Sequence, residues 1–162
     1  VTGSGDGTAI LWHTEVGLSH KLRGHGSSIT GVVFSAAGDK LVTGSEDGTA
    51  TLWDVEMGTK LRVLRGHDAG VWVVAFSPNG DKVVTGSRDK TAAVWHVETG
   101  RRLHVLRGHD SYIMAVAVCP CGQKLVTGGA DACIIVWDIE HGVMLKQIKR
   151  RGPLDLWGRL PI

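Results

Sequence analysis

The stretch VTGSRDKTAAVW, Val84 to Trp95, occurs four times in this 162-residue chain with small changes. The other copies are VTGSGDGTAILW at 1–12, VTGSEDGTATLW at 42–53 and VTGGADACIIVW at 126–137. They align without gaps, and their tryptophans lie 41, 42 and 42 residues apart. A fixed period of about 40 residues is typical of repeat proteins, in which each repeat is one supersecondary unit.

Three further landmarks recur in step with this stretch. The tetrapeptide LRGH ends at His25, His67 and His109, and each histidine precedes a tryptophan by 28 residues. A turn signature recurs as SAAGDK at 35–40, SPNGDK at 77–82 and CPCGQK at 119–124. A fourth landmark appears as VEMGTK, VETGRR and IEHGVM, which begin at residues 55, 97 and 139. Four independent landmarks that recur at the same spacing indicate a true internal repeat.

Each unit predicts four short strands. The apolar runs ITGVVF, VWVVAF and IMAVAV are bounded by turn residues, as a buried inner strand would be. The β-branched segments KLVTGS and KVVTGS follow, then TATLW and TAAVW, then the alternating KLRVL and RLHVL. The links are hairpin-sized and rich in Gly, Asn, Asp and Pro. No window sustains a helical stripe of apolar residues, so the sequence predicts antiparallel meanders.

Composition excludes several classes of protein. Net charge is +2, too slight to indicate a nucleic-acid or membrane partner. Wholly apolar runs such as residues 71–76 are far short of the roughly 20 residues of a membrane span. The cysteines Cys119, Cys121 and Cys133 are too few and too clustered for a disulfide framework. They fit a reducing compartment, so we expect the cytoplasm, with the nucleus as the alternative.

The repeat resembles the WD40 family, which has Gly-His near one end of a repeat of this length and Trp-Asp at the other. Trp53-Asp54 and Trp137-Asp138 carry the dipeptide, whereas Trp12-His13 and Trp95-His96 depart from it. The resemblance implies an all-β propeller of four-stranded blades around a central channel. We expect an array over 1–148 with repeats near 1–12, 24–54, 66–96 and 108–138. These give three complete blades and a partial one in an incomplete ring, followed by a basic tail over 149–162.

The family assigns a hydrogen-bonded tetrad of His, Thr, Asp and Trp to each blade. Trp donates, carboxylate accepts, and a Thr hydroxyl and a neutral imidazole do both, so Trp to Thr to His to Asp satisfies every member. The first unit has Thr2, Asp6 and Trp12, and its histidine would lie before residue 1. Carried onto this chain, the resemblance gives the tetrads His25, Thr43, Asp47, Trp53; His67, Thr85, Asp89, Trp95; and His109, Thr127, Asp131, Trp137.

The same residue types could be a Thr-His-Asp relay for nucleophilic catalysis. Catalysis needs one site, whereas a scaffold needs the same contacts in every unit, so we expect a structural role and no enzyme activity. We expect no cofactor and no metal site, because Cys119 and Cys121 lie in a turn and a zinc site needs better-spaced ligands and a fourth one. The glycines of VTGS precede no helix that could bind phosphate, so they indicate tight hairpins instead.

Partners of the family usually dock on the top face, around the mouth of the channel. Trp72 draws attention there because Thr30 and Met114 hold the matching positions, so no shared packing need explains an indole. Trp, Tyr and Arg are enriched at binding hot spots. We therefore expect a protein or peptide partner on residues that include Trp72, Arg88, Tyr112, Met114, Thr30 and Glu46. Core packing of Trp72 is the alternative.

Three blades and part of a fourth fall short of a usual propeller of 4–8 blades. We expect a fragment of a longer chain, or self-association through open blade edges whose apolar flanks would otherwise be wet. The predicted function is a non-catalytic scaffold for complex assembly. The alternative is a sensing or regulatory region of a larger nucleotide-hydrolysing signalling protein, whose catalytic motifs would lie elsewhere, since no P-loop occurs in these residues.

Overall fold

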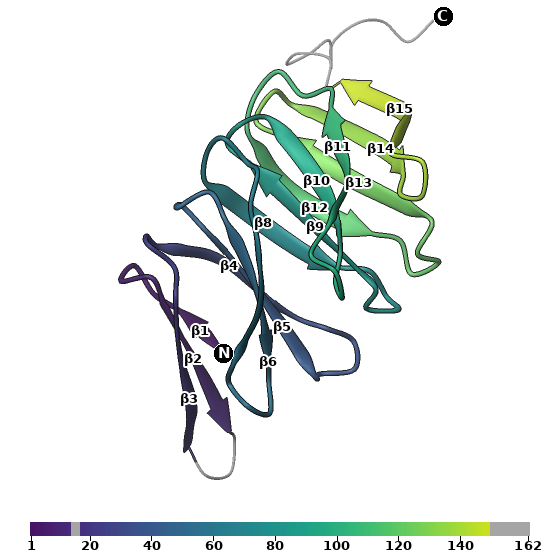
Figure 1. The fold of residues 1–162 in the computed structure, drawn as a ribbon. Helices are drawn as coiled ribbons and strands as arrows, with labels where there is room; N and C mark the ends of the chain where they lie inside the picture. The colour runs from purple at the N-terminus through teal and green to yellow at the C-terminus, as the bar shows by residue number, and fades with distance from the viewer. Residues whose placement is uncertain (14–16, 150–162) are drawn as a thin grey trace, which may run out of the picture.

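The computed structural model describes residues 1–13 and 17–149, and these form strands joined by turns and loops. Figure 1 shows four sheets that follow one another from the N-terminal end, in purple, to the C-terminal end, in yellow. Every pairing is antiparallel between strands that are consecutive in sequence. The prediction of an all-β array with three four-stranded blades and a partial one is confirmed, and the described sheets form an open series rather than a closed ring.

The strand bounds follow the predicted segments closely. The first sheet has three strands and each of the others has four. The first sheet comprises β1 (Thr2–Gly3), β2 (Thr8–His13) and β3 (Gly17–Arg23). The second comprises β4 (Ile29–Phe34), β5 (Lys40–Ser45), β6 (Ala50–Asp54) and β7 (Lys60–Leu64). The third comprises β8 (Val71–Phe76), β9 (Lys82–Ser87), β10 (Thr91–His96) and β11 (Arg102–Arg107). The fourth comprises β12 (Ile113–Val118), β13 (Lys124–Gly129), β14 (Cys133–Asp138) and β15 (Val143–Lys149).

The strand that follows each Gly-His begins a sheet, and these first strands lie side by side. β8 contacts both β4 and β12. The core lies between successive sheets, because one apolar cluster combines Val42 and Leu52 of the second sheet with Val83 and Trp95 of the third. Successive sheets thus bury their facing sides against each other, as repeats that are unstable alone must.

The last sheet exposes apolar side chains to solvent. Met144, Leu145 and Ile148 on β15 and Ile134 on β14 are 42–51% exposed. β15 runs through Lys149, which pairs with Cys133, so the array extends one residue past the boundary expected at 148. The rest of the predicted basic tail, 150–162, lies outside the described residues. Within 1–13 and 17–149, no helix is long and apolar enough to cross a membrane.

Candidate functional site

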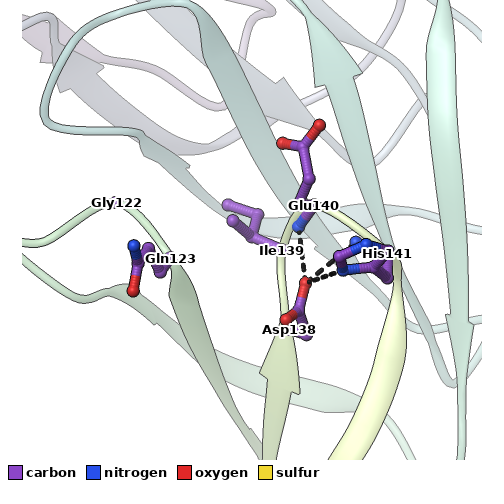
Figure 2. A pocket seen from close by; sticks show the side chains of 6 residues that line it. All are labelled: Gly122, Gln123, Asp138, Ile139, Glu140 and His141. Carbon is purple, nitrogen blue, oxygen red and sulfur yellow. Dashed lines mark hydrogen bonds and ion pairs between the residues drawn. The ribbon is translucent and has the colours of Figure 1, made fainter.

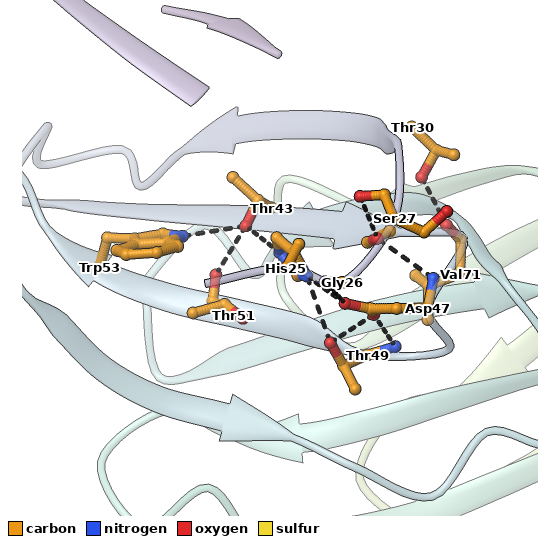
Figure 3. Close-up of polar contacts among 11 residues, drawn as sticks. His25, Gly26, Ser27, Thr30, Thr43, Asp47, Thr49, Thr51, Trp53 and Val71 are labelled. Carbon is orange, nitrogen blue, oxygen red and sulfur yellow. Dashed lines mark hydrogen bonds and ion pairs between the residues drawn. The ribbon is translucent and has the colours of Figure 1, made fainter. Parts of the chain in front are cut away.

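The four side chains predicted to act together in the second sheet form one chain of contacts (Figure 3). The indole N–H of Trp53 on β6 lies 2.9 Å from the hydroxyl of Thr43 on β5. That hydroxyl lies 2.7 Å from Nε2 of His25, in the loop before β4. His25 Nδ1 lies 3.0 Å from Oδ2 of Asp47, in the turn between β5 and β6. Two strands and two loops are therefore joined by one polar network.

The chemistry of the groups fixes the direction of these bonds. An indole N–H only donates and a carboxylate only accepts. Trp53 therefore donates to Thr43, the Thr43 hydroxyl donates to His25 Nε2, and His25 Nδ1–H donates to Asp47. This arrangement requires a neutral imidazole with its proton on Nδ1.

The same network recurs in the next two sheets. Indole-to-threonine distances are 2.9 Å for Trp95 to Thr85 and for Trp137 to Thr127. The threonine hydroxyls lie 2.7 and 2.8 Å from Nε2 of His67 and His109. The histidines lie 2.7 and 2.9 Å from Asp89 and Asp131. In the first sheet Trp12 donates to Thr2 over 3.1 Å, and the indole is 51% exposed.

A fifth member of the network was not predicted from the sequence. The Thr49 hydroxyl donates to Asp47 Oδ1 over 2.6 Å, and Thr91 does the same to Asp89. The signal was present, because a threonine recurs two residues after each of these aspartates and after Asp6. In the fourth sheet Cys133 takes this place, and its backbone N–H donates to Asp131 over 3.0 Å.

Hydrogen bonding keeps the second-sheet carboxylate ionised. Burial by itself raises the pKa of Asp47, but hydrogen bonds from the Thr49 hydroxyl, the backbone N–H groups of Gly26 and Thr49, and His25 lower it to about 2. Burial lowers the pKa of His25, and this exceeds the opposite effect of its hydrogen bond and attraction to Asp47. Both shifts favour a neutral imidazole beside an ionised carboxylate, which is the pair that the directions of the hydrogen bonds require.

A long cationic side chain on the outer strand covers the buried indole in the second and third sheets. Lys60 Nζ lies 5.5 Å from the ring centroid of Trp53, and Arg102 Cζ lies 5.8 Å from that of Trp95. Arg102 also donates to the carbonyl of Gly66 over 2.7 Å. Gly66 has a φ of 133°, and an added Cβ would lie 2.6 Å from the Arg102 guanidinium, which explains the glycine before the histidine.

The threonine hydroxyls that join each indole to its histidine are buried. Thr43, Thr85 and Thr127 have no solvent exposure, whereas a nucleophile must reach a bound reactant. A pocket at the opposite end of the fourth sheet is lined by residues of two turns, with Asp138 hydrogen-bonded to His141 (Figure 2). In the part of the chain that the structure describes, this pocket included, no three metal-ligating side chains gather.

The predicted partner-binding residues fall into a compact group and two outliers. Arg88 Cζ lies 5.3 Å from the ring centroids of both Trp72 and Tyr112, and those centroids are 6.0 Å apart. Trp72 is half-buried, while Tyr112 and Met114 are 39% and 51% exposed. We call Trp72, Arg88, Tyr112 and Met114 the Arg88 surface. It spans the third and fourth sheets, at the end of the strands where the histidine loops lie.

The two outliers lie on the second sheet. The Thr30 hydroxyl donates to the carbonyl of Val71 over 2.5 Å and links β4 to β8 (Figure 3). Its hydroxyl is therefore engaged within the array. Glu46 is exposed, and its backbone N–H donates to the carbonyl of Ser28.

A β-bulge sets the position of three of these residues. The first strand of each complete sheet has a break in its pairing register. The break lies between Ile29 and Gly31 on β4, between Val71 and Val73 on β8, and between Ile113 and Ala115 on β12. The unpaired residues are therefore Thr30, Trp72 and Met114. A bulge turns a side chain out of the regular alternation and is common next to binding sites.

Comparison with known families decides the family of the chain. The family described as "WD domain, G-beta repeat" matches at residues 17–54, 58–96 and 100–138. Those matches cover most of the described sheets and all three complete networks. The chain belongs to the WD40 family.

The fold is common among solved structures, since 1385 chains match this one, so the fold by itself selects no particular function. One match is the crystal structure of the computationally designed Ika8 protein, with a TM-score of 0.82 and 38% sequence identity. The alignment covers 90% of this chain and 44% of that one. A search of curated proteins found no match. WD40 repeats support a role in protein interaction in general, and WD40 domains are generally non-catalytic.

Proposed function

We propose that this WD40 array binds a protein partner through the Arg88 surface and thereby helps to assemble a complex. The observation that carries the proposal is the guanidinium of Arg88, which lies 5.3 Å from two aromatic rings contributed by adjacent sheets. Cation–π contacts at exposed sites contribute about 0.5–1 kcal/mol each. Two such contacts hold Arg88 in place before a partner arrives, which lowers the entropic cost of binding.

The stacked Arg88 side chain can still form hydrogen bonds with a partner. A guanidinium is planar, so stacking engages its faces and leaves the N–H groups on its edge available for a bidentate contact. A carboxylate matches that fork in geometry and charge. We therefore assign the partner a segment with an Asp, a Glu or a terminal carboxylate.

The rest of the Arg88 surface is apolar. Tyr112 lies beside the guanidinium, Met114 on β12 is exposed two residues further along, and methionine adapts its shape to different partners. The indole nitrogen of Trp72 is buried and has no acceptor among the described residues. A partner would therefore meet the exposed apolar side chains of this surface rather than that enclosed nitrogen. The partner segment should therefore place an apolar side chain beside its carboxylate.

A selection from a random peptide library tests this proposal. Peptides displayed on phage are selected on the immobilised chain, and the affinity of the enriched peptides is measured by calorimetry. We expect enrichment of acidic residues next to apolar ones. Arg88→Ala should weaken binding at least tenfold, and Arg88→Lys should also weaken it, because lysine keeps the charge but lacks the planar fork.

The matched control is Arg101→Ala, which removes an exposed arginine from the turn between β10 and β11 at the other end of the sheet. This variant should bind the selected peptides as the unchanged chain does. Equal losses in both arginine variants would show that net charge, rather than the Arg88 surface, governs binding. Enriched peptides that bind Arg88→Ala at full strength would refute the proposal.

A further inference from the structure

The turn between β12 and β13 differs from the corresponding turns of the two preceding sheets. In those sheets the buried hydroxyls of Ser35 and Ser77 close the turn. Each donates to an aspartate, over 2.8 Å to Asp39 and 2.9 Å to Asp81. Each also accepts a backbone N–H of the following lysine, at 3.0 and 2.9 Å. In the fourth sheet Cys119 replaces the serine and Gln123 replaces the aspartate, so the hydrogen bond from serine to aspartate is lost.

The backbone of the turn is nevertheless unchanged. The N–H of Cys119 donates to the carbonyl of Lys124 over 2.8 Å, and the N–H of Gly122 donates to the carbonyl of Cys119 over 2.8 Å. Ser35 and Gly38 make the same two bonds at 2.9 Å in the second sheet. The hairpin therefore holds its shape through backbone bonds, whatever the side chains at 119 and 121 do.

What the turn has instead is a cysteine pair. The sulfurs of Cys119 and Cys121 are bonded, and their Cα atoms are 5.2 Å apart, within the usual range for a disulfide. The intervening loop is a single residue, so the bond removes little entropy from the unfolded chain. Cys121 and Pro120 are exposed and Cys119 is half-buried. An exposed disulfide with little stabilising role is of the labile kind that exchanges with other thiols.

We propose that Cys119 and Cys121 form a reversible thiol–disulfide exchange site on the WD40 array. The reactant class is a low-molecular-weight disulfide such as oxidised glutathione. The site lies at the end of the strands opposite the Arg88 surface, and it does not depend on the function proposed for that surface. Cys133 takes no part, because it lies on β14 and is only 3% exposed.

The exchange proceeds in two balanced steps. The thiolate of Cys121, the more exposed of the two, attacks one sulfur of the oxidant and forms a mixed disulfide, and one thiol leaves. The thiolate of Cys119 then attacks Sγ of Cys121, forms the internal disulfide and releases the second thiol. Two electrons pass from the cysteines to the oxidant, and the two cysteine protons end on the released thiols. Excess reduced glutathione reverses both steps.

The exchange site borders the pocket of Figure 2. Cys121 directly precedes Gly122 and Gln123, which line this pocket together with the turn that carries Asp138, Glu140 and His141.

Thiol counting in glutathione buffers tests the proposal. The full chain is equilibrated at a series of reduced-to-oxidised ratios, quenched in acid, denatured and labelled with a maleimide polymer. The chain should pass from three free thiols to one in a single two-electron step, with Cys133 as the thiol that remains. Cys119→Ser installs the residue of the two sister turns, so it should fold normally. It should also retain glutathione on Cys121, as seen by intact mass.

Three results would overturn the proposal. The unchanged chain could keep three free thiols in oxidised glutathione. It could retain a glutathione adduct as Cys119→Ser does, which would mean that Cys119 does not resolve the mixed disulfide. Its disulfide could also resist excess reduced glutathione, which would make the bond structural rather than exchangeable. Circular dichroism of Cys119→Ser and of Cys121→Asn, which installs the Asn79 residue of the third sheet, confirms that the variants are folded.

Discussion

Thr85 carries the polar network of the third sheet, because its hydroxyl forms hydrogen bonds with both the indole of Trp95 and the imidazole of His67. The hydroxyl has no solvent exposure. Thr85→Val keeps the shape of the side chain and removes both hydrogen bonds. Two buried groups, Trp95 Nε1–H and His67 Nε2, then lose their partner, and water cannot replace it.

The expected loss follows from those two groups. Each unsatisfied buried group costs about 1–3 kcal/mol, and neighbouring losses are not additive. We expect Thr85→Val to lower the free energy of unfolding by about 3 kcal/mol. Thr85→Ser keeps the hydroxyl and loses one methyl group, so it should lower it by about 1 kcal/mol. Urea unfolding at neutral pH, followed by circular dichroism, measures both changes.

The chain supplies a matched control in Thr51. This threonine on β6 is fully buried, yet its hydroxyl has no hydrogen-bond partner among the described residues. Ala93 and Ile135 hold the same position in the next two sheets. Thr51→Val should leave stability unchanged or raise it by up to about 1 kcal/mol. A loss for Thr85→Val no larger than that for Thr51→Val would contradict the role of the Thr85 hydroxyl, and so would equal losses for Thr85→Ser and Thr85→Val.

Two further outcomes are expected. The pKa of His25 is lowered in the fold, so its contribution to stability is complete above its ordinary pKa of 6.5 and declines as pH falls below that value. The urea midpoint should therefore be lower at pH 5.5 than at pH 7.5, and His25→Gln should reduce this difference. Gly142→Ala should destabilise the array more than Gly80→Ala. Both glycines have a positive φ (66° and 74°), but a Cβ at 142 would lie 2.5 Å from the His104 ring, whereas a Cβ at 80 would have nothing within 4 Å. Equal losses of melting temperature in the two glycine variants would contradict the packing between these sheets.

The repeats made the sheets and the networks predictable. A 42-residue spacing with turn residues at fixed places leaves one simple solution, a four-stranded meander per unit. The donor and acceptor chemistry of Trp, Thr, His and Asp then allows one direction of hydrogen bonding. For this reason the structure brings Trp53, Thr43, His25 and Asp47 together as the sequence predicted.

Other features depend on information that a single sequence does not carry. The bulges at Thr30, Trp72 and Met114 arise from the register between two strands, and strand register follows from the pairing of the strands rather than from one strand's pattern. The contact of Arg88 with both rings depends on how two sheets are rotated against each other. The bonding of Cys119 to Cys121 depends on the local turn, whereas the sequence showed only that a turn occurs there.

The most direct test of the proposed binding surface is a nuclear magnetic resonance titration of the indole N–H signals with a selected acidic peptide. The chain has six tryptophans, and Trp53, Trp95 and Trp137 donate to buried threonines, while the indole nitrogen of Trp72 has no acceptor. The signal of Trp72 should shift as the peptide binds, and the other three signals should stay in place. Saturable binding with an unmoved Trp72 signal, or with shifts in the three buried indoles instead, would contradict it.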